Sequence, residues 1–260
     1  MESVLDHVAE TFLSEVYRVH YLEYNKLMRL YNGETGSFAP TSTEFDDSPL
    51  ELDMWRWLYD TLAIGIDTPD NQYRDRFAAA TPKDQIEMVR GFCVLISRVV
   101  QVFILSRPSK THPSPVYRGI MLHPTSPPVE DVFPEGAVLS SYSVLSTTMD
   151  PDVAKLFSQK GPRSVTFRIF TDPDTLGFNF KGYEFPPEDG DPDDEAEIAL
   201  PPGTKLVVRK RVGGPHENKV VWAQIVENVP LQRYVPRSSG AAQSWVWELE
   251  ARVDPDFSRL

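Results

Sequence analysis

Two hydrophobic periodicities divide the chain into a helical first part and a strand-rich second part. Apolar residues recur every three or four positions over residues 2–30 and again near 50–65, which predicts two amphipathic helices. A third helix is predicted to begin at Thr81-Pro82 and to run to about Ser106, because threonine caps a helix and proline fits its first turn. Residues 31–49 have no period and predict a loop.

Short β-type runs separated by Pro and Gly take over from about residue 114. They predict strands at 116–120, 137–140, 144–148, 164–170, 205–212 and 220–226. One helix, over 151–159, interrupts them after the cap Asp150. The alternation of Trp245, Trp247 and Leu249 favours a last strand packed on the core over a segment that binds a partner. Helices followed by strands indicate an α+β fold rather than alternating βαβ units.

Charge and cysteine content narrow the choice of partners and compartment. A net charge of -12 argues against nucleic acid as a partner and favours a protein with a basic surface. The single cysteine, Cys93, rules out a disulfide framework and is predicted to be a buried thiol. The start Met1-Glu2-Ser3 is acidic, and no apolar run approaches the length of a membrane span. We therefore expect a protein that does not enter membranes and is cytoplasmic, or is delivered into a host cell without an N-terminal signal peptide.

Several motifs of common enzyme classes are absent from the sequence. It contains no Gly-x-Gly-x-x-Gly, no Walker-type Gly-Lys-Ser/Thr loop, no His-Glu-x-x-His and no Gly-x-Ser-x-Gly. Dehydrogenases, P-loop NTPases, zincins and serine hydrolases are therefore disfavoured. The five histidines are scattered singly, so we predict no metal site.

Three segments in a particular order carry the candidate chemistry. They are Tyr117-Arg118-Gly119, Ser146-Thr147-Thr148, and the run from Glu195 through Glu197 to Pro201-Pro202-Gly203-Thr204. This order resembles the Arg, Ser-Thr-Ser, Glu-x-Glu signature of mono-ADP-ribosyltransferases of the clostridial-toxin-like and vertebrate ecto-enzyme class. The resemblance covers about residues 114–228 and departs from the family at Thr148, where serine is usual. It implies NAD as a substrate, transfer of ADP-ribose to a protein, and no metal.

The residue types also suit the chemistry that this reaction requires. Cleavage of the nicotinamide bond passes through an oxocarbenium-like ribose, so an enzyme must hold the diphosphate and place negative charge beside the sugar. Arg118 supplies a planar, permanently charged fork for phosphate oxygens. Glu197 supplies a carboxylate that accepts from a ribose hydroxyl and stabilises the developing positive charge.

Four further residues complete the candidate site. Gly119 lets the backbone approach a ligand closely, and the resemblance implies that this backbone binds the nicotinamide amide; it is otherwise an ordinary strand glycine. Ser146 and Thr148 lie two apart on a predicted strand, so their hydroxyls share one face, where they brace Glu197 and line the pocket. Arg163, in the turn after the 151–159 helix, is a candidate second phosphate contact, although an exposed arginine in a turn needs no such role.

The acidic segment 184–197 is the candidate region for the acceptor. It holds eight acids, which a solvated loop also explains, and its place in the chain corresponds to the target-recognition loop of the family. If it is extended, Glu195 and Glu197 point to the same side, where a guanidinium would relieve their repulsion. The resemblance therefore favours arginine as the acceptor. Tyr183 and Phe185 either contact the target or anchor the loop.

The sequence thus predicts N-terminal helices packed on a mixed two-sheet ADP-ribosyltransferase core. Its predicted parts are a helical region at 1–108, a catalytic core at 109–232 and a C-terminal extension at 233–260. Two alternatives remain open: an NAD glycohydrolase that uses the same residues with water as acceptor, and a non-catalytic interaction module in which residues 1–108 do the work.

Overall fold

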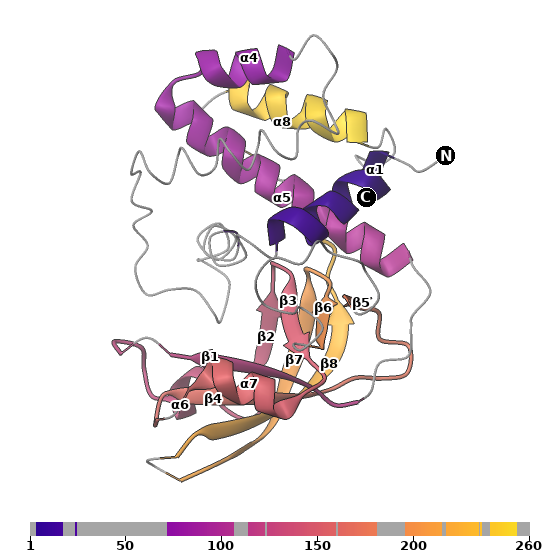
Figure 1. Cartoon of the computed structure of the whole chain (residues 1–260). Coiled ribbons are helices and arrows are strands. Elements are labelled where there is room, and N and C mark those ends of the chain that lie inside the picture. The colour runs from indigo at the N-terminus through magenta and orange to yellow at the C-terminus, as the bar shows by residue number, and fades with distance from the viewer. Residues whose placement is uncertain are drawn as a thin grey trace. The chain divides into compact units, whose positions relative to one another are not determined.

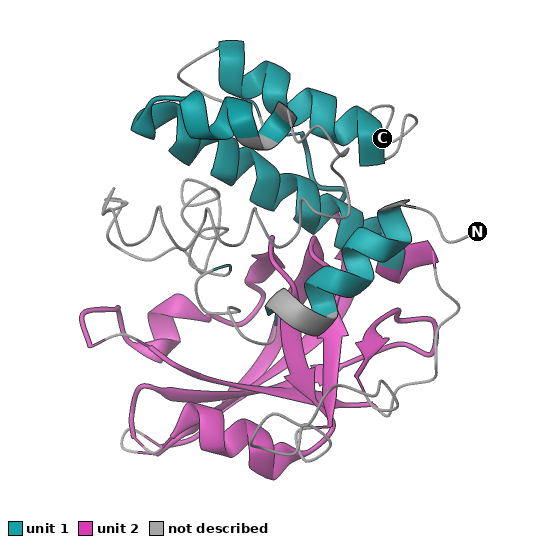
Figure 2. Ribbon diagram, turned by 45° about the horizontal axis from the view of Figure 1, so that its top comes forward, with its two compact units in different colours: residues 1–33, 42–103, 230–260 teal, residues 34–41, 104–229 magenta. Residues whose placement is uncertain are grey.

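The computed structural model of the chain forms two compact units (Figure 2). Unit 1 comprises residues 1–33, 42–103 and 230–260, and unit 2 comprises residues 34–41 and 104–229. The residues that the structure describes are 4–17, 24, 72–106, 114–122, 124–159, 161–180, 196–214, 217–233, 235 and 240–253. The helix predicted at 50–65 and the loop predicted at 31–49 lie outside them.

Helices make up the described part of unit 1. They are α1 (Val4–Thr11), a π-helical segment η1 (Phe12–Tyr17), α4 (Gln72–Ala79), α5 (Pro82–Ser106) and α8 (Gly240–Val253) (Figure 1). The helix predicted over 2–30 is confirmed as far as Tyr17, and Leu5, Val8 and Phe12 of its apolar face are buried. The sequence did not predict α4, whose buried aromatic residues are Tyr73 and Phe77.

The long helix α5 begins and ends where the sequence predicts. The Thr81 hydroxyl accepts the backbone N–H of Asp84 at 3.2 Å and donates to its carboxylate at 2.8 Å, so the predicted cap is present. By length and composition α5 is apolar enough to cross a membrane, which the sequence reading did not recognise, but most of its apolar stretch is buried inside the protein. The predicted burial of Cys93 is confirmed, and this burial raises the pKa of its thiol.

The C-terminal segment is a helix, so the strand predicted there is wrong. Residues 242, 245, 246, 249, 250 and 253 of α8 are buried, and this spacing of three and four is helical. Trp247 of the apparent alternation is 37% exposed, whereas Trp245 is fully buried and its indole N–H donates to the Tyr73 carbonyl at 3.0 Å. The alternating pattern predicted a strand wrongly because Trp245 and Leu249 are also one helical turn apart.

A buried charged group joins α8 to α5 within unit 1. The Glu250 carboxylate, 1% exposed, pairs with the Arg98 guanidinium and lies 2.6 Å from Arg233 Nε. Desolvation, with a smaller contribution from the nearby Arg233 charge, lowers the pKa of Arg98 to about 10. Because both charges of the Arg98–Glu250 pair are removed from water, the cost of burying each charge is offset by its attraction to the other.

Unit 2 is built around one continuous eight-stranded sheet in the order β2-β7-β8-β4-β1-β3-β6-β5. Its strands are β1 (Val116–Met121), β2 (Val138–Ser141), β3 (Leu145–Thr148), β4 (Ser164–Phe170), β5 (Phe178–Asn179), β6 (Glu197–Leu200), β7 (Thr204–Val212) and β8 (Lys219–Asn228). β4 and β8 are parallel, and the other pairs are antiparallel. The described residues are therefore α+β with a mixed sheet, and the strands predicted between residues 116 and 226 are present within a few residues of their predicted ends.

The sequence predicts two sheets, whereas the structure joins them into one. β1 makes a full antiparallel ladder with β4 but only one residue pair, Tyr117 with Thr148, with β3. Figure 1 shows β1 and β4 lying across the view, whereas the antiparallel strands β3 and β6 lie roughly vertical. The single link between β1 and β3 is the point where the sheet changes direction, and it lies next to Arg118.

Alternating residues of the strands form the core of unit 2. On β4, Val165, Phe167 and Ile169 are buried in a cluster that also contains residues of β1, β6, β7 and β8. The opposite face of β1 is covered by α7 (Pro151–Ser158), whose cap Asp150 accepts the Asp152 N–H at 2.7 Å. A short helix, α6 (Val129–Val132), was not predicted.

Candidate functional site

The three segments that carry the candidate chemistry meet on neighbouring strands. Arg118 is on β1, Ser146 and Thr148 are on β3, and Glu197 is the first residue of β6. The sheet order places β3 between β1 and β6, and Thr148 is the cross-strand partner of both Tyr117 and Glu197. Strand pairing therefore brings together residues that are up to 79 positions apart in the sequence.

Ser146 connects the guanidinium to the carboxylate. Arg118 Nη1 donates to the Ser146 carbonyl oxygen at 2.7 Å, and the Ser146 hydroxyl donates to Glu197 Oε1 at 2.6 Å. The three residues are all partly exposed. The site thus holds a fixed cation and a fixed anion on either side of one serine, and both remain accessible from outside the protein.

The Thr148 side chain takes part in the turn from β3 into α7, and its predicted place in the pocket stays a prediction. Its side chain is 6% exposed, and its hydroxyl accepts the Asp150 N–H at 3.0 Å, where the chain turns into α7. Of the two predicted hydroxyls, it is Ser146 whose contact with Glu197 is observed. Thr147, on the other face, donates to the Ile198 carbonyl at 2.6 Å and strengthens the pairing of β3 with β6.

The backbone turns at Ala196, directly before Glu197. Ala196 has a φ of 45°, in the left-handed region, and its carbonyl accepts the Met149 N–H at 3.1 Å. Glu195 and Glu197 are predicted to point to the same side if the segment is extended, and the backbone is not extended at Ala196. Glu195 itself, Tyr183 and Phe185 lie outside the described residues.

Gly119 lies beneath α7. A Cβ at this position would be 1.8 Å from the Ala154 carbonyl oxygen and 2.7 Å from the Ser158 nitrogen, both backbone atoms of the helix. Only glycine permits this approach between helix and strand. The sequence reading considered a ligand or an ordinary strand position for Gly119, and it missed the helix. Its proposed contact with nicotinamide remains a prediction.

The turn after α7 is held by a residue that the sequence reading missed. The turn contains Gln159 at a φ of 58° and Gly161 at a φ of 145°. The Asn218 side chain accepts the Gly161 N–H at 2.9 Å and donates to the Gln159 carbonyl at 2.7 Å. Its amide thus pairs with the turn as a peptide group would. No local pattern marks Asn218, which is 57 residues from Gly161 in the chain.

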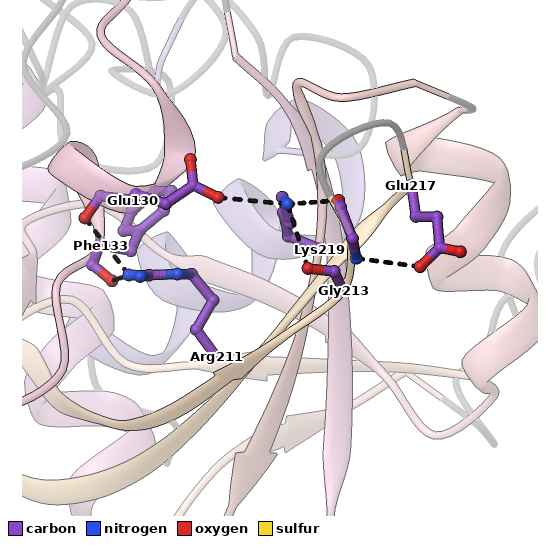
Figure 3. A network of polar contacts seen from close by, with 7 residues as sticks. Glu130, Phe133, Arg211, Gly213, Glu217 and Lys219 are labelled. Atoms are coloured by element: carbon purple, nitrogen blue, oxygen red, sulfur yellow. Dashed lines mark hydrogen bonds and ion pairs between the residues drawn. The ribbon is translucent and has the colours of Figure 1, made fainter.

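Asn218 belongs to a hairpin that is itself fixed by Lys219 (Figure 3). The buried Lys219 ammonium donates to the carbonyls of Gly213 and Gly214 and lies 3.2 Å from Glu130 Oε1. A hydrogen bond to its own backbone and the nearby Lys219 lower the pKa of Glu130. The hairpin that carries Asn218 is therefore tied to α6, and it supports the turn after α7 from a fixed position.

Arg163, the candidate second phosphate contact, lies in this same turn. Its Nη1 donates to the Ser126 carbonyl at 2.6 Å, and its own carbonyl accepts the Leu122 N–H at 3.0 Å. Arg163 thus joins the turn to the segment after β1. Its proposed role toward phosphate is untested by these contacts and stays a prediction.

In the part of the chain that the structure describes, no group of three or more His, Cys, Asp or Glu side chains is arranged to hold a metal ion. Four of the five histidines fall outside that part, and the remaining one, His7, is exposed. The observation therefore extends only to the described residues.

Comparisons with known proteins give similar folds at low sequence identity. No protein-family model and no curated protein sequence matches the chain. Among solved structures, the catalytic domain of VahC from Aeromonas hydrophila is 14% identical, with 87% of this chain and 98% of that chain covered and a TM-score of 0.47. Vis toxin, an ADP-ribosyltransferase from Vibrio splendidus, is 15% identical over 74% of this chain and 90% of that chain, with a TM-score of 0.38. The ADP-ribosyltransferase HopU1 of Pseudomonas syringae is 15% identical over 85% and 87%, with a TM-score of 0.36. These values are too low to assign a function, so the function is argued from the residues of the site.

Proposed function

We propose that this chain is an enzyme that transfers ADP-ribose from NAD to a protein side chain and releases nicotinamide. The observation that supports this most is the hydrogen-bonded connection from Arg118 through Ser146 to Glu197. Cleavage of NAD requires a cation for the diphosphate and an anion for the ribose, and this site holds one of each at a short separation.

Arg118 is the residue we assign to the diphosphate. A guanidinium has five N–H donors in a planar fork, and the Ser146 carbonyl occupies one of its terminal nitrogens. That contact orients the group, while the remaining donors stay available for a pair of phosphate oxygens. Lysine in this position would keep the charge but lose the fork.

Glu197 is the residue we assign to the ribose. In the proposed reaction the bond from the ribose C1 to the nicotinamide nitrogen breaks, and its electron pair leaves with nicotinamide. Positive charge develops on the sugar, where the carboxylate stabilises it. The Ser146 hydroxyl donates to Oε1 and so fixes the carboxylate that we assign to a ribose hydroxyl. An acceptor nitrogen then attacks C1 and gives up its proton.

We propose arginine as the acceptor, and the acidic segment 184–195 as the region that meets a basic target. The support for this is the resemblance of Glu195 and Glu197 to the Glu-x-Glu pair and the concentration of acids in the sequence before them. A negative segment beside the site would steer a cationic protein surface toward it.

Glu197→Gln tests the assignment most directly, because it keeps the shape of the side chain and removes its charge. We expect incorporation of label from biotinylated NAD into lysate protein to fall by about 10² to 10³-fold. Glu227→Gln removes an exposed carboxylate of β8 and serves as the matched control. Unchanged labelling by Glu197→Gln, with folding intact by circular dichroism, would refute the role of Glu197.

The products separate the proposed transfer from its alternatives. Mass spectrometry of the labelled protein identifies the acceptor, and a residue other than arginine would contradict that part of the proposal. Release of free ADP-ribose without labelled protein would indicate an NAD glycohydrolase. Absence of NAD binding by calorimetry would favour the non-catalytic module.

A further inference from the structure

A row of cations and aromatic rings crosses the outer face of three neighbouring strands in unit 2. Lys210 of β7 is the cross-strand partner of Trp222 of β8, and Trp222 is the partner of Arg168 of β4. Cross-strand partners project to the same face of a sheet. This face is opposite the core, because Val221 and Phe167, the residues directly before Trp222 and Arg168, are buried in the core cluster. We name Lys210, Trp222 and Arg168 the cation–aromatic row.

The rings hold the cations in place. The Arg168 guanidinium carbon lies 5.2 Å from the Trp222 ring centroid and 5.3 Å from that of Phe170. The Lys210 ammonium lies 5.4 Å from the Trp222 centroid and comes from the strand on the other side of β8. Contacts of this kind are attractive because the ring face carries partial negative charge. They fix where the charges lie without neutralising them.

A β-bulge adds a third cation to this face. The register of β7 against β8 shifts between Val208 and Lys210, so that Arg209 is an extra residue. Its guanidinium donates twice to the Gln224 side-chain oxygen, at 3.1 and 2.8 Å. Gln224 is two residues after Trp222 on β8 and shares its face. Arg209 and Lys210 are therefore consecutive residues whose side chains both reach the outer face.

Among the residues that the structure describes, no carboxylate forms an ion pair with these three cations, Arg168, Arg209 and Lys210. The Arg168 Nε is buried and has no hydrogen-bond partner. In a chain with a net charge of -12, where acids exceed bases, a face that gathers three unpaired cations stands apart from the rest of the composition.

We propose that this face binds a short acidic segment of a partner protein. Carboxylates of such a segment would form ion pairs with Arg209, Lys210 and Arg168. The exposed valines at the two ends of the face, Val212 and Val226, 44% and 45% exposed, would contact its apolar side chains. The role is additional to the proposed transfer reaction and does not depend on it.

The same features disfavour single-stranded nucleic acid as the occupant. Proteins that bind single strands stack bases on bare aromatic faces. Here cations from both neighbouring strands already lie against Trp222, and the chain as a whole repels a long polyanion. A short acidic peptide needs neither a free ring face nor a long positive track.

Fluorescence anisotropy with a defined probe tests the proposal. The probe is a fluorescein-labelled eight-residue peptide with four glutamates alternating with valines, and its matched partner has glutamine in place of glutamate. We expect the full-length protein to bind the glutamate peptide, more weakly as salt rises, and at least about tenfold more tightly than the glutamine peptide. Equal binding of the two peptides, or no binding of either at low salt, would overturn the proposal.

Variants locate the binding on this face. The double variant Arg209→Glu, Lys210→Glu changes exposed residues and is expected to weaken binding of the glutamate peptide by at least about tenfold. Lys83→Glu, at an exposed position of α5 in unit 1, is the control for net charge and is compared with Lys210→Glu alone, because each changes the net charge by the same amount. A comparable loss with Lys83→Glu would show that binding follows overall charge and would refute the assignment. Tighter binding of labelled oligothymidylate than of the peptide would refute the choice of partner.

Discussion

Glycine at position 119, where α7 contacts β1, has two competing explanations: helix packing and ligand binding. If packing requires it, Gly119→Ala destabilises the protein whether or not NAD is present. If only a ligand requires it, the variant folds normally and binds NAD less tightly. The structure favours packing, because the added Cβ would meet the Ala154 carbonyl oxygen at 1.8 Å, the Ser158 nitrogen at 2.7 Å and the Ala154 carbonyl carbon at 2.9 Å.

The expected magnitude follows from the kind of atoms that overlap. All three belong to the helix backbone, so no side-chain rotation relieves the contact, and α7 must move away from β1. Overpacking costs about 1–3 kcal/mol, and we expect the upper end of about 3 kcal/mol because the obstruction is rigid. With a urea dependence of about 2 kcal/mol per M, the unfolding midpoint would fall by about 1.5 M.

Urea denaturation followed by circular dichroism measures this change, and amide hydrogen exchange shows where it occurs. Exchange should accelerate in residues 116–121 and 151–158, which form β1 and α7. Gly240→Ala is the matched control, because no atom lies within 4 Å of a Cβ placed there. A Gly119→Ala midpoint equal to that of the control would refute the packing explanation. Weaker NAD binding without loss of stability would assign Gly119 to the ligand instead.

Three further predictions concern the contacts that support the two units. Asn218→Ala removes both hydrogen bonds to the turn after α7, so hydrogen exchange at Gly161 should accelerate, while Asn228→Ala, at the far end of β8, should leave that exchange unchanged. Glu250→Gln leaves the Arg98 charge buried, so unfolding free energy should fall by about 3–5 kcal/mol, whereas Glu248→Gln, in an exposed pair of the same helix, should cost under about 1 kcal/mol. Because the pKa of Glu130 is lowered in the fold, its stabilisation is present above its ordinary pKa of 4.5 and is lost as pH falls through the lowered value; Glu130→Gln should reduce the acid sensitivity measured by thermal unfolding.

Local patterns correctly predicted the elements whose buried residues can be recognised from the sequence of the element alone. The helix α5 carries its start signal in Thr81-Pro82, and the alternating apolar residues of β4, Val165, Phe167 and Ile169, are the ones that enter the core cluster. The pattern at the C-terminus failed because Trp245 and Leu249 fit both a strand and a helix, and only the surroundings decide between them. For α8 those surroundings include the Tyr73 carbonyl that accepts from Trp245, which no local pattern contains.

The candidate site was predictable as a set of residue types, but its connections were not. The order of the three segments identified Arg118, Ser146 and Glu197, and the structure places them on adjacent strands. That Ser146 contacts Glu197 while Thr148 is turned to the start of α7 depends on the direction of each side chain at the end of β3. The Asn218 contact depends on a hairpin that comes near the turn only after folding.

The backbone at Ala196 limits how the two glutamates of the candidate site can act together. Residues two apart share a face only in an extended strand, and a left-handed residue between them reverses the local direction of the chain. Alanine in this region costs about 1 kcal/mol, which the surrounding contacts must offset. The hydrogen bond from Met149 to the Ala196 carbonyl continues the pairing of β3 with β6 and supplies part of that support. Glu197, the first residue of β6, is therefore held in the sheet by its pairing with Thr148. The proposed role of Glu197 beside the sugar rests on this placement.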